Sequence, residues 1–137
     1  MIEGWHNDDY FILFESDESE RIAQGYGIPE SFPGYELVGL IGWDDFILAK
    51  PDGTRCRVPT VPLDHTEMTV FDGSIADSEL IADEKLIGRI KWYIKPIVFG
   101  GDPGLGENVT WVDLDAHQQL VRWWNQKYVE IKRGTET

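Results

Sequence analysis

The chain has 137 residues, a length that suits one folded domain with no need for a disulfide or a metal. Hydrophobic residues make up 42%, including six Trp, six Phe and five Tyr, which argues against disorder. The net charge is −13, from 25 acidic and 12 basic side chains, and such a field argues against nucleic acid and anionic membranes as partners. We predict a single domain over residues 1–137.

The first third of the chain reads as a strand followed by a helix. Residues 9–15 (DYFILFE) are short and rich in aromatic and β-branched residues, which favours a strand. A helix of about two turns should follow, because Asp17 and Glu20 have capping-box spacing and Gly27 and Pro29 are stop signals.

Three further strands are predicted over residues 35–42, 43–49 and 54–61, with a hairpin turn at Pro51–Gly53. Alternation in the last strand places Cys56 on the same face as Val58, opposite Arg55 and Arg57. We therefore interpret Cys56 as a small buried hydrophobic residue and not as a reactive thiol.

The single Cys56 also excludes an intramolecular disulfide and a multi-cysteine zinc site, which is compatible with a reducing compartment. No basic start followed by a long apolar segment is visible, so we expect neither a secretory signal nor a transmembrane helix. Together these observations predict a cytoplasmic protein.

The middle of the chain is the hardest part to interpret. Residues 77–88 (DSELIADEKLIG) are compatible with a short acidic helix that runs into a loop. Residues 89–94 alternate between apolar and polar side chains, which predicts a half-buried strand. Pro96 should either break this strand before residues 97–99 (IVF) or confine it to the edge of a sheet. Another short strand is predicted at 108–112.

Residues 113–133 give the clearest helix, with Asp115 and Gln118 at capping positions. One apolar stripe runs along it through His117, Leu120, Val121, Trp124, Tyr128 and Ile131. Trp123 lies on the flank of this stripe, where it is either a partly buried rim residue or an anchor for a partner. The elements together predict an α+β fold: a mainly antiparallel twisted sheet of five to six strands, with the long amphipathic C-terminal helix on one face.

The glycine-rich segment 100–108 (GGDPGLGEN) raises the question of a phosphate site. Gly101 and Gly106 have the spacing of a nucleotide-binding loop, but Glu107 and Asn108 stand where Lys and Ser or Thr are required. We interpret the segment as an acidic connector between a strand ending at Phe99 and one beginning near Val109. Any ligand it binds should be cationic.

No sequence motif of a hydrolase, a metalloprotease or a calcium loop is present, and we predict no catalytic residue, cofactor or metal. Asp113, Asp115 and His117 could meet at a metal if extended, but they are equally explained as the entry and cap of the last helix. Asp44 and Asp45 would point to opposite faces of a strand, so they form a pair only if the chain turns there.

Residues 26–53 carry a resemblance to a known family. Ile28, Pro29, Glu30 and Phe32, followed by a glycine-bearing apolar strand and a Trp/Asp segment, resemble the start of the SUKH superfamily. The resemblance implies a small acidic α+β protein. Many members are bacterial immunity proteins that neutralise toxin domains, and fungal members regulate cell-wall synthesis. No functional residue is transferred from it.

The charge pattern and this resemblance favour a non-catalytic binding protein of the immunity or antitoxin type, with a basic protein partner. The candidate contact residues are nine acids and one aromatic side chain: Asp64, Glu67, Asp72, Asp77, Glu79, Asp83, Glu84, Asp102, Glu107 and Trp123. The acids of residues 15–20 are another possible contact surface. Alternatives are a small-molecule site or enzyme beside 100–108 and Trp92 or Trp111, and a structural subunit of a larger assembly.

Overall fold

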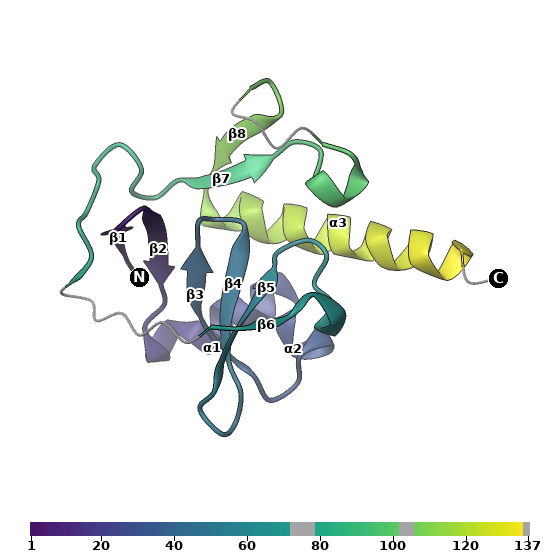
Figure 1. The fold of residues 1–137 in the computed structure, drawn as a ribbon, viewed down its shortest axis with the longest axis horizontal. Coiled ribbons are helices and arrows are strands. Elements are labelled where there is room, and N and C mark those ends of the chain that lie inside the picture. The colour runs from purple at the N-terminus through teal and green to yellow at the C-terminus, as the bar shows by residue number, and fades with distance from the viewer. Residues whose placement is uncertain (72–78, 102–105, 136–137) are drawn as a thin grey trace.

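Six antiparallel strands lie side by side in sequence order in the main sheet (Figure 1). They are β1 (Ile2–His6), β2 (Asp9–Leu13), β3 (Glu36–Ile41), β4 (Asp45–Ala49), β5 (Arg55–Pro59) and β6 (Thr69–Val70). A separate antiparallel pair is formed by β7 (Ile90–Tyr93) and β8 (Val109–Val112). This computed structural model describes residues 1–71, 79–101 and 106–135, with the side chains of the last helix described as far as Lys132.

Three α-helices and two short 3-10 helices are fully contained in the described residues. The α-helices are α1 (Ser16–Tyr26), α2 (Ile28–Ser31) and α3 (Leu114–Thr135), and the 3-10 helices are η1 (His65–Glu67) and η3 (Ile97–Phe99). The predicted α+β class, with a six-stranded antiparallel sheet and a C-terminal helix, is confirmed. None of the described helices combines the length and the hydropathy that a membrane span requires.

Hairpins connect the neighbouring strands at both ends of the sheet. The predicted turn at Pro51–Gly53 is confirmed: Asp52 accepts a hydrogen bond from the Thr54 amide (2.8 Å), and Gly53 has φ 89°. The β1–β2 hairpin was not predicted. Its turn contains Asn7 at φ 55°, which asparagine tolerates better than most residues.

One face of the main sheet forms the core together with α1 and α3. Phe46, Leu48, Cys56 and Val58 are all buried on this face, and the predicted shared face of Cys56 and Val58 is thereby confirmed. The helix α1 is three turns long, because it starts directly after β2, and its capping box is therefore Glu15 with Glu18, not Asp17 with Glu20.

The long helix α3 packs against α1 and β7 along its first half and then extends past the sheet (Figure 1). The predicted stripe is buried accordingly: His117 and Val121 are fully buried, whereas Ile131 is 47% exposed. The N-terminal cap is Asp113, which accepts from the Ala116 amide at 2.8 Å, because the helix starts at Leu114, two residues earlier than the predicted Asp115 cap requires.

Two local predictions were wrong. The described residues of 77–88 form no α-helix, because Ile81 exchanges two backbone hydrogen bonds with Trp5 at the edge of β1 (2.8 and 2.9 Å). The strand after Arg89 ends at Tyr93, not Phe99, because the chain folds into η3 after Pro96.

Candidate functional site

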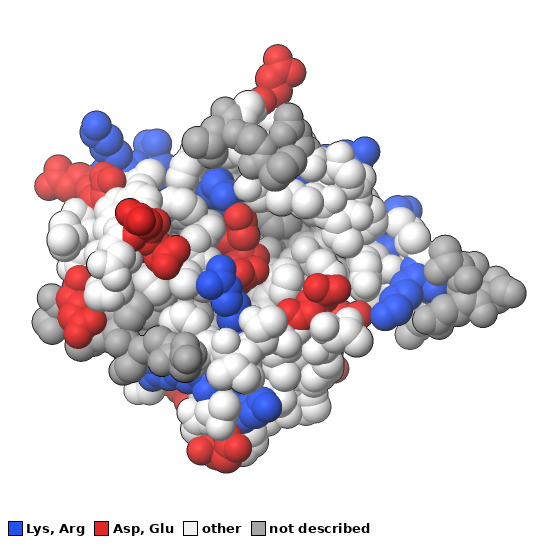
Figure 2. All heavy atoms as spheres, viewed as in Figure 1, with Lys and Arg blue, Asp and Glu red and all other residues white. Residues whose placement is uncertain are grey.

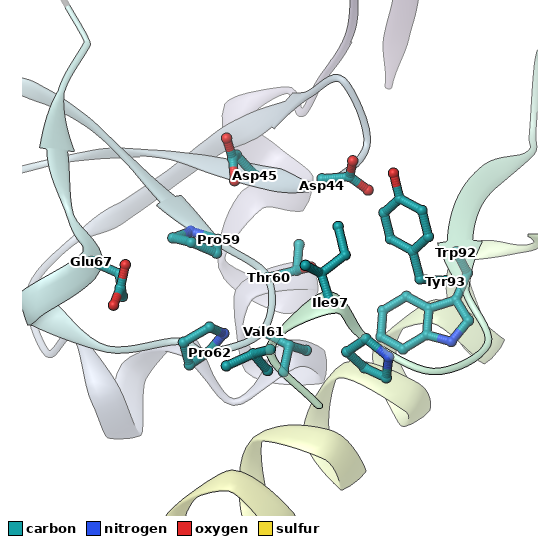
Figure 3. A pocket seen from close by; sticks show the side chains of 12 residues that line it. Asp44, Asp45, Pro59, Thr60, Val61, Pro62, Glu67, Trp92, Tyr93 and Ile97 are labelled. Carbon is teal, nitrogen blue, oxygen red and sulfur yellow. The ribbon is translucent and has the colours of Figure 1, made fainter. Parts of the chain in front are cut away.

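A groove of about 330 Å³ opens between the β4–β5 end of the main sheet and the segment that follows β7 (Figure 3). Its surface is mostly apolar, and the apolar residues come from two chain segments: Pro59, Val61 and Pro62 on one side, and Trp92, Pro96, Ile97 and Val98 on the other. Asp44 and Asp45 stand along one edge, and Glu67 lies at the end opposite Trp92. The groove thus combines apolar walls with three carboxylates.

The turn between β3 and β4 brings Asp44 and Asp45 into the same groove. Residues 42–44 form this turn, with Gly42 at φ 59° and Trp43 at φ 61°. A positive φ is unfavourable for tryptophan, but the Trp43 ring stacks on Tyr10 with 4.9 Å between centroids, which holds it there. The chain therefore does turn here, with Asp44 in the turn and Asp45 at the start of the strand, and both side chains line the groove.

The wall at residues 59–63 is attached to helix α3 by Asn125. The Asn125 side chain accepts from the Leu63 amide and donates to the Thr60 carbonyl, both at 2.7 Å. The Thr60 amide in turn donates to the Asp44 carbonyl at 2.9 Å. Asn125 was not identified from the sequence, because nothing in its helical position indicates a partner more than sixty residues away.

The opposite wall is shaped by the start of the glycine-rich segment. The Asn108 side chain accepts from the Lys95 amide (2.8 Å) and donates to the Lys95 carbonyl (2.9 Å). A side chain at Gly101 would collide with that same carbonyl, and Gly100 has φ 91°. Gly100 therefore has a turn conformation that favours glycine, while Gly101 is needed for close approach.

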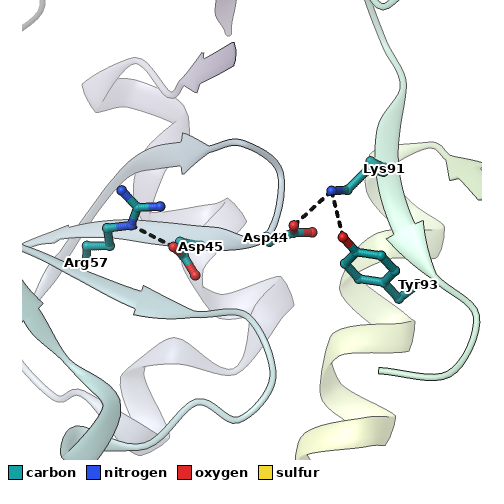
Figure 4. A network of polar contacts seen from close by, with 5 residues as sticks. All are labelled: Asp44, Asp45, Arg57, Lys91 and Tyr93. Atoms are coloured by element: carbon teal, nitrogen blue, oxygen red, sulfur yellow. Dashed lines mark hydrogen bonds and ion pairs between the residues drawn. The ribbon is translucent and has the colours of Figure 1, made fainter. Parts of the chain in front are cut away.

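Two ion pairs hold the carboxylates along the groove edge (Figure 4). The Lys91 Nζ lies 2.9 Å from Asp44 and donates to the Tyr93 hydroxyl at 3.1 Å, and the Arg57 Nε donates to Asp45 at 2.6 Å. Burial raises the pKa of Asp44, and this effect outweighs the opposing attraction of Lys91. As the pH falls, Asp44 therefore takes up a proton more readily than an exposed aspartate does.

The groove carries a net negative charge. Its described lining contains three carboxylates and no Lys or Arg, and the two cations that pair with Asp44 and Asp45 approach from outside the lining. Within the described residues Glu67 has no side-chain partner and is exposed. Figure 2 shows acidic side chains on both sides of a hollow near the centre of this face.

Three of the acids predicted as contact residues lie outside the groove and have structural partners. Asp64 caps η1 by accepting from the Thr66 amide (3.0 Å) and pairs with Lys132 (3.1 Å). Asp83 accepts from the Trp5 indole at 3.2 Å. Glu79 lies 3.9 Å from the His6 ring. Among the described members of this predicted set, Glu67 alone lines the groove.

Three other described contact candidates lie outside the groove lining. Glu84 and Glu107 are exposed, and Trp123 is 56% exposed with its ring edge against Trp124. Asp72, Asp77 and Asp102 lie outside the described residues. Sequence reasoning thus found one groove carboxylate as a contact candidate and considered Asp44 and Asp45 only as a catalytic pair.

The buried polar residues outside the groove form a structural contact. His117 Nδ1 and the Tyr26 hydroxyl are hydrogen-bonded at 2.6 Å in the core, and burial lowers the pKa of His117 to about 3. Asp113 and Asp115 are exposed, so they do not meet His117. Within the described part of the chain, no group of three or more His, Cys, Asp and Glu side chains is arranged to hold a metal.

Comparison of the chain with family models, with curated proteins and with solved structures gave no match.

Proposed function

We propose that the protein is a non-catalytic binding protein of the immunity or antitoxin type, and that it binds a basic protein partner through the groove. The observation that carries the proposal is the grouping of Asp44, Asp45 and Glu67 around apolar walls, on a chain with a net charge of −13. Apolar area surrounded by charge is typical of protein interfaces, in which charge speeds association and buried area supplies affinity. The SUKH-like segment 26–53 fits this function. A cytoplasmic location belongs to the same proposal.

The test uses the purified product of the adjacent gene, with binding measured by calorimetry at low and high salt. Electrostatic attraction should make the complex about tenfold weaker or more at high salt, because salt screens exposed charges. Affinity that is indifferent to salt would count against a basic partner.

Two double variants locate the interface. Asp45→Asn with Glu67→Gln removes two charges at the groove, while Asp17→Asn with Glu20→Gln removes two exposed charges on α1. We expect the groove variant to lose about tenfold or more in affinity and the α1 variant to change by about twofold or less. The opposite result would move the interface to residues 15–20.

A second function is favoured by the volume and the walls of the same groove. A cavity of about 330 Å³ lined by Trp92 and several prolines falls within the size range of small-molecule sites. A thermal-shift screen of metabolites tests this alternative, and a hit that is lost in Ile97→Asp would favour it over a protein partner.

A further inference from the structure

The shape of the groove restricts what kind of basic group it can accept. Its walls are apolar, and its carboxylates stand at the edge and at one end. A small inorganic cation would leave the walls exposed to water. A long side chain with an aliphatic stem and a cationic end fits both parts, because Lys and Arg bury their stems on apolar surface while the charge meets carboxylates.

The charges along the groove leave room for one more cation. Asp44, Asp45 and Glu67 face only Lys91 and Arg57 as paired cations, so one negative charge is uncompensated among the described residues. Asp45 uses one oxygen for Arg57, whereas a carboxylate offers about four acceptor sites. Glu67 adds further acceptors from the other end of the groove.

The chemistry of the groove favours a guanidinium over an ammonium group. Asp45 already accepts a guanidinium N–H from Arg57 at 2.6 Å, so a guanidinium can reach this edge of the groove at hydrogen-bond distance. A guanidinium is planar, offers five N–H donors in a geometry that matches carboxylates, and is more weakly hydrated than an ammonium. It therefore loses less hydration when it enters an apolar groove.

We propose that the groove receives one arginine side chain of the partner, with its stem along Val61, Pro62 and Ile97 and its guanidinium between Asp45 and Glu67. This inference rests on the proposed function and names the chemical group that the partner presents. Arginine is also among the residues that most often dominate the energy of protein interfaces.

The experiment titrates the ¹⁵N-labelled protein with three capped amino acids: Nα-acetyl-arginine methylamide and the corresponding lysine and citrulline compounds. Citrulline has nearly the shape of arginine and no charge. We expect saturable shifts at Thr60, Val61 and Ile97 with the arginine compound, about fivefold weaker binding of the lysine compound, and no saturation with the citrulline compound. Glu67→Gln should weaken arginine binding about threefold or more, and Asp17→Asn should leave it unchanged.

Equal binding of lysine and arginine, saturation by citrulline, or no groove shift with any compound would each overturn the inference. None of these results decides the proposed function, because that is tested separately with the whole partner and the two charge variants. The arginine compound could fail to bind while the partner still binds in a salt-dependent way that requires the groove. Another basic group of the partner would then occupy the groove.

Discussion

The core around Tyr26 and His117 and the groove edge around Asp44 and Asp45 both contain polar side chains, but the two regions differ in their exposure to water. In the core, His117 has no exposed surface and one hydrogen bond, and burial favours its neutral form. At the groove edge, Asp44 is 41% exposed and remains paired with a cation. The buried polar groups of the core therefore contact only other parts of the fold, whereas the exposed carboxylates of the groove can still accept hydrogen bonds from a ligand.

A substitution confined to the core should have the largest effect on stability. Phe46→Ala removes a fully buried ring that packs edge-on against Tyr26. The free energy of unfolding should fall by about 3–5 kcal/mol, because a cavity is left behind. Urea denaturation measures this loss. Phe46→Leu, which retains most of the volume, should cost less, and an equal cost would contradict the cavity explanation.

The pH dependence of stability tests the neutral state of His117. Its pKa is lowered from 6.5 to about 3 in the folded state, so the unfolded state binds the proton more readily. Stability is therefore fully present above pH 6.5 and is lost as the pH falls, by about 2 kcal/mol between pH 7.5 and pH 5. Urea denaturation at both values measures the loss. His117→Asn should be less stable but lack this dependence; a variant that keeps all of it would refute the assignment.

Asn125 joins the two regions, so its replacement should affect both. Asn125→Ala leaves the Leu63 amide and the Thr60 carbonyl without their side-chain partner. Unfolding should become easier by about 1–3 kcal/mol, the cost of unsatisfied groups, and arginine binding should weaken as the wall loosens. Denaturation and the titration together provide the readout. Gln126→Ala, an exposed neighbour, is the matched control and should change neither.

The smallest stability effect is expected at the groove edge. Lys91→Met removes the partner of Asp44 and should cost about 1 kcal/mol, because this ion pair is partly exposed. The pKa of Asp44 should rise further, which a carboxyl NMR titration detects. Arg57→Met breaks the Asp45 pair in the same way and should leave Asp44 nearly unchanged. A fall in the Asp44 pKa in Lys91→Met would contradict the described pairing.

Local patterns predicted the elements whose signals lie within a few residues. The β4–β5 hairpin, the burial of Cys56 and the C-terminal helix all follow from alternation, turn residues or a helical stripe. The predictions that failed depended on distant contacts. The described residues of 77–88 form no α-helix, because the Ile81 backbone pairs with Trp5 of β1, and β1 itself was not predicted from the sequence.

Only a few separate residues of the candidate site could be predicted from the sequence. Glu67 was identified by charge, and the alternative site was placed near residues 100–108, next to the wall that Ile97 and Val98 provide. The pairing of Asp44 with Asp45 depends on positive φ at Gly42 and Trp43, which aromatic packing stabilises. Lys91, Arg57 and Asn125 acquire their roles through partners that lie far away in the chain.

The sequence by itself determined the fold class, the acidity and the main faces of the strands, because side-chain alternation and net charge are properties of the chain. Only the tertiary structure decided which acids act together. Of 25 acidic residues, Asp44, Asp45 and Glu67 share a groove because a turn, a strand start and a 3-10 helix meet there. Such proximity depends on how elements pack, and no local pattern encodes it.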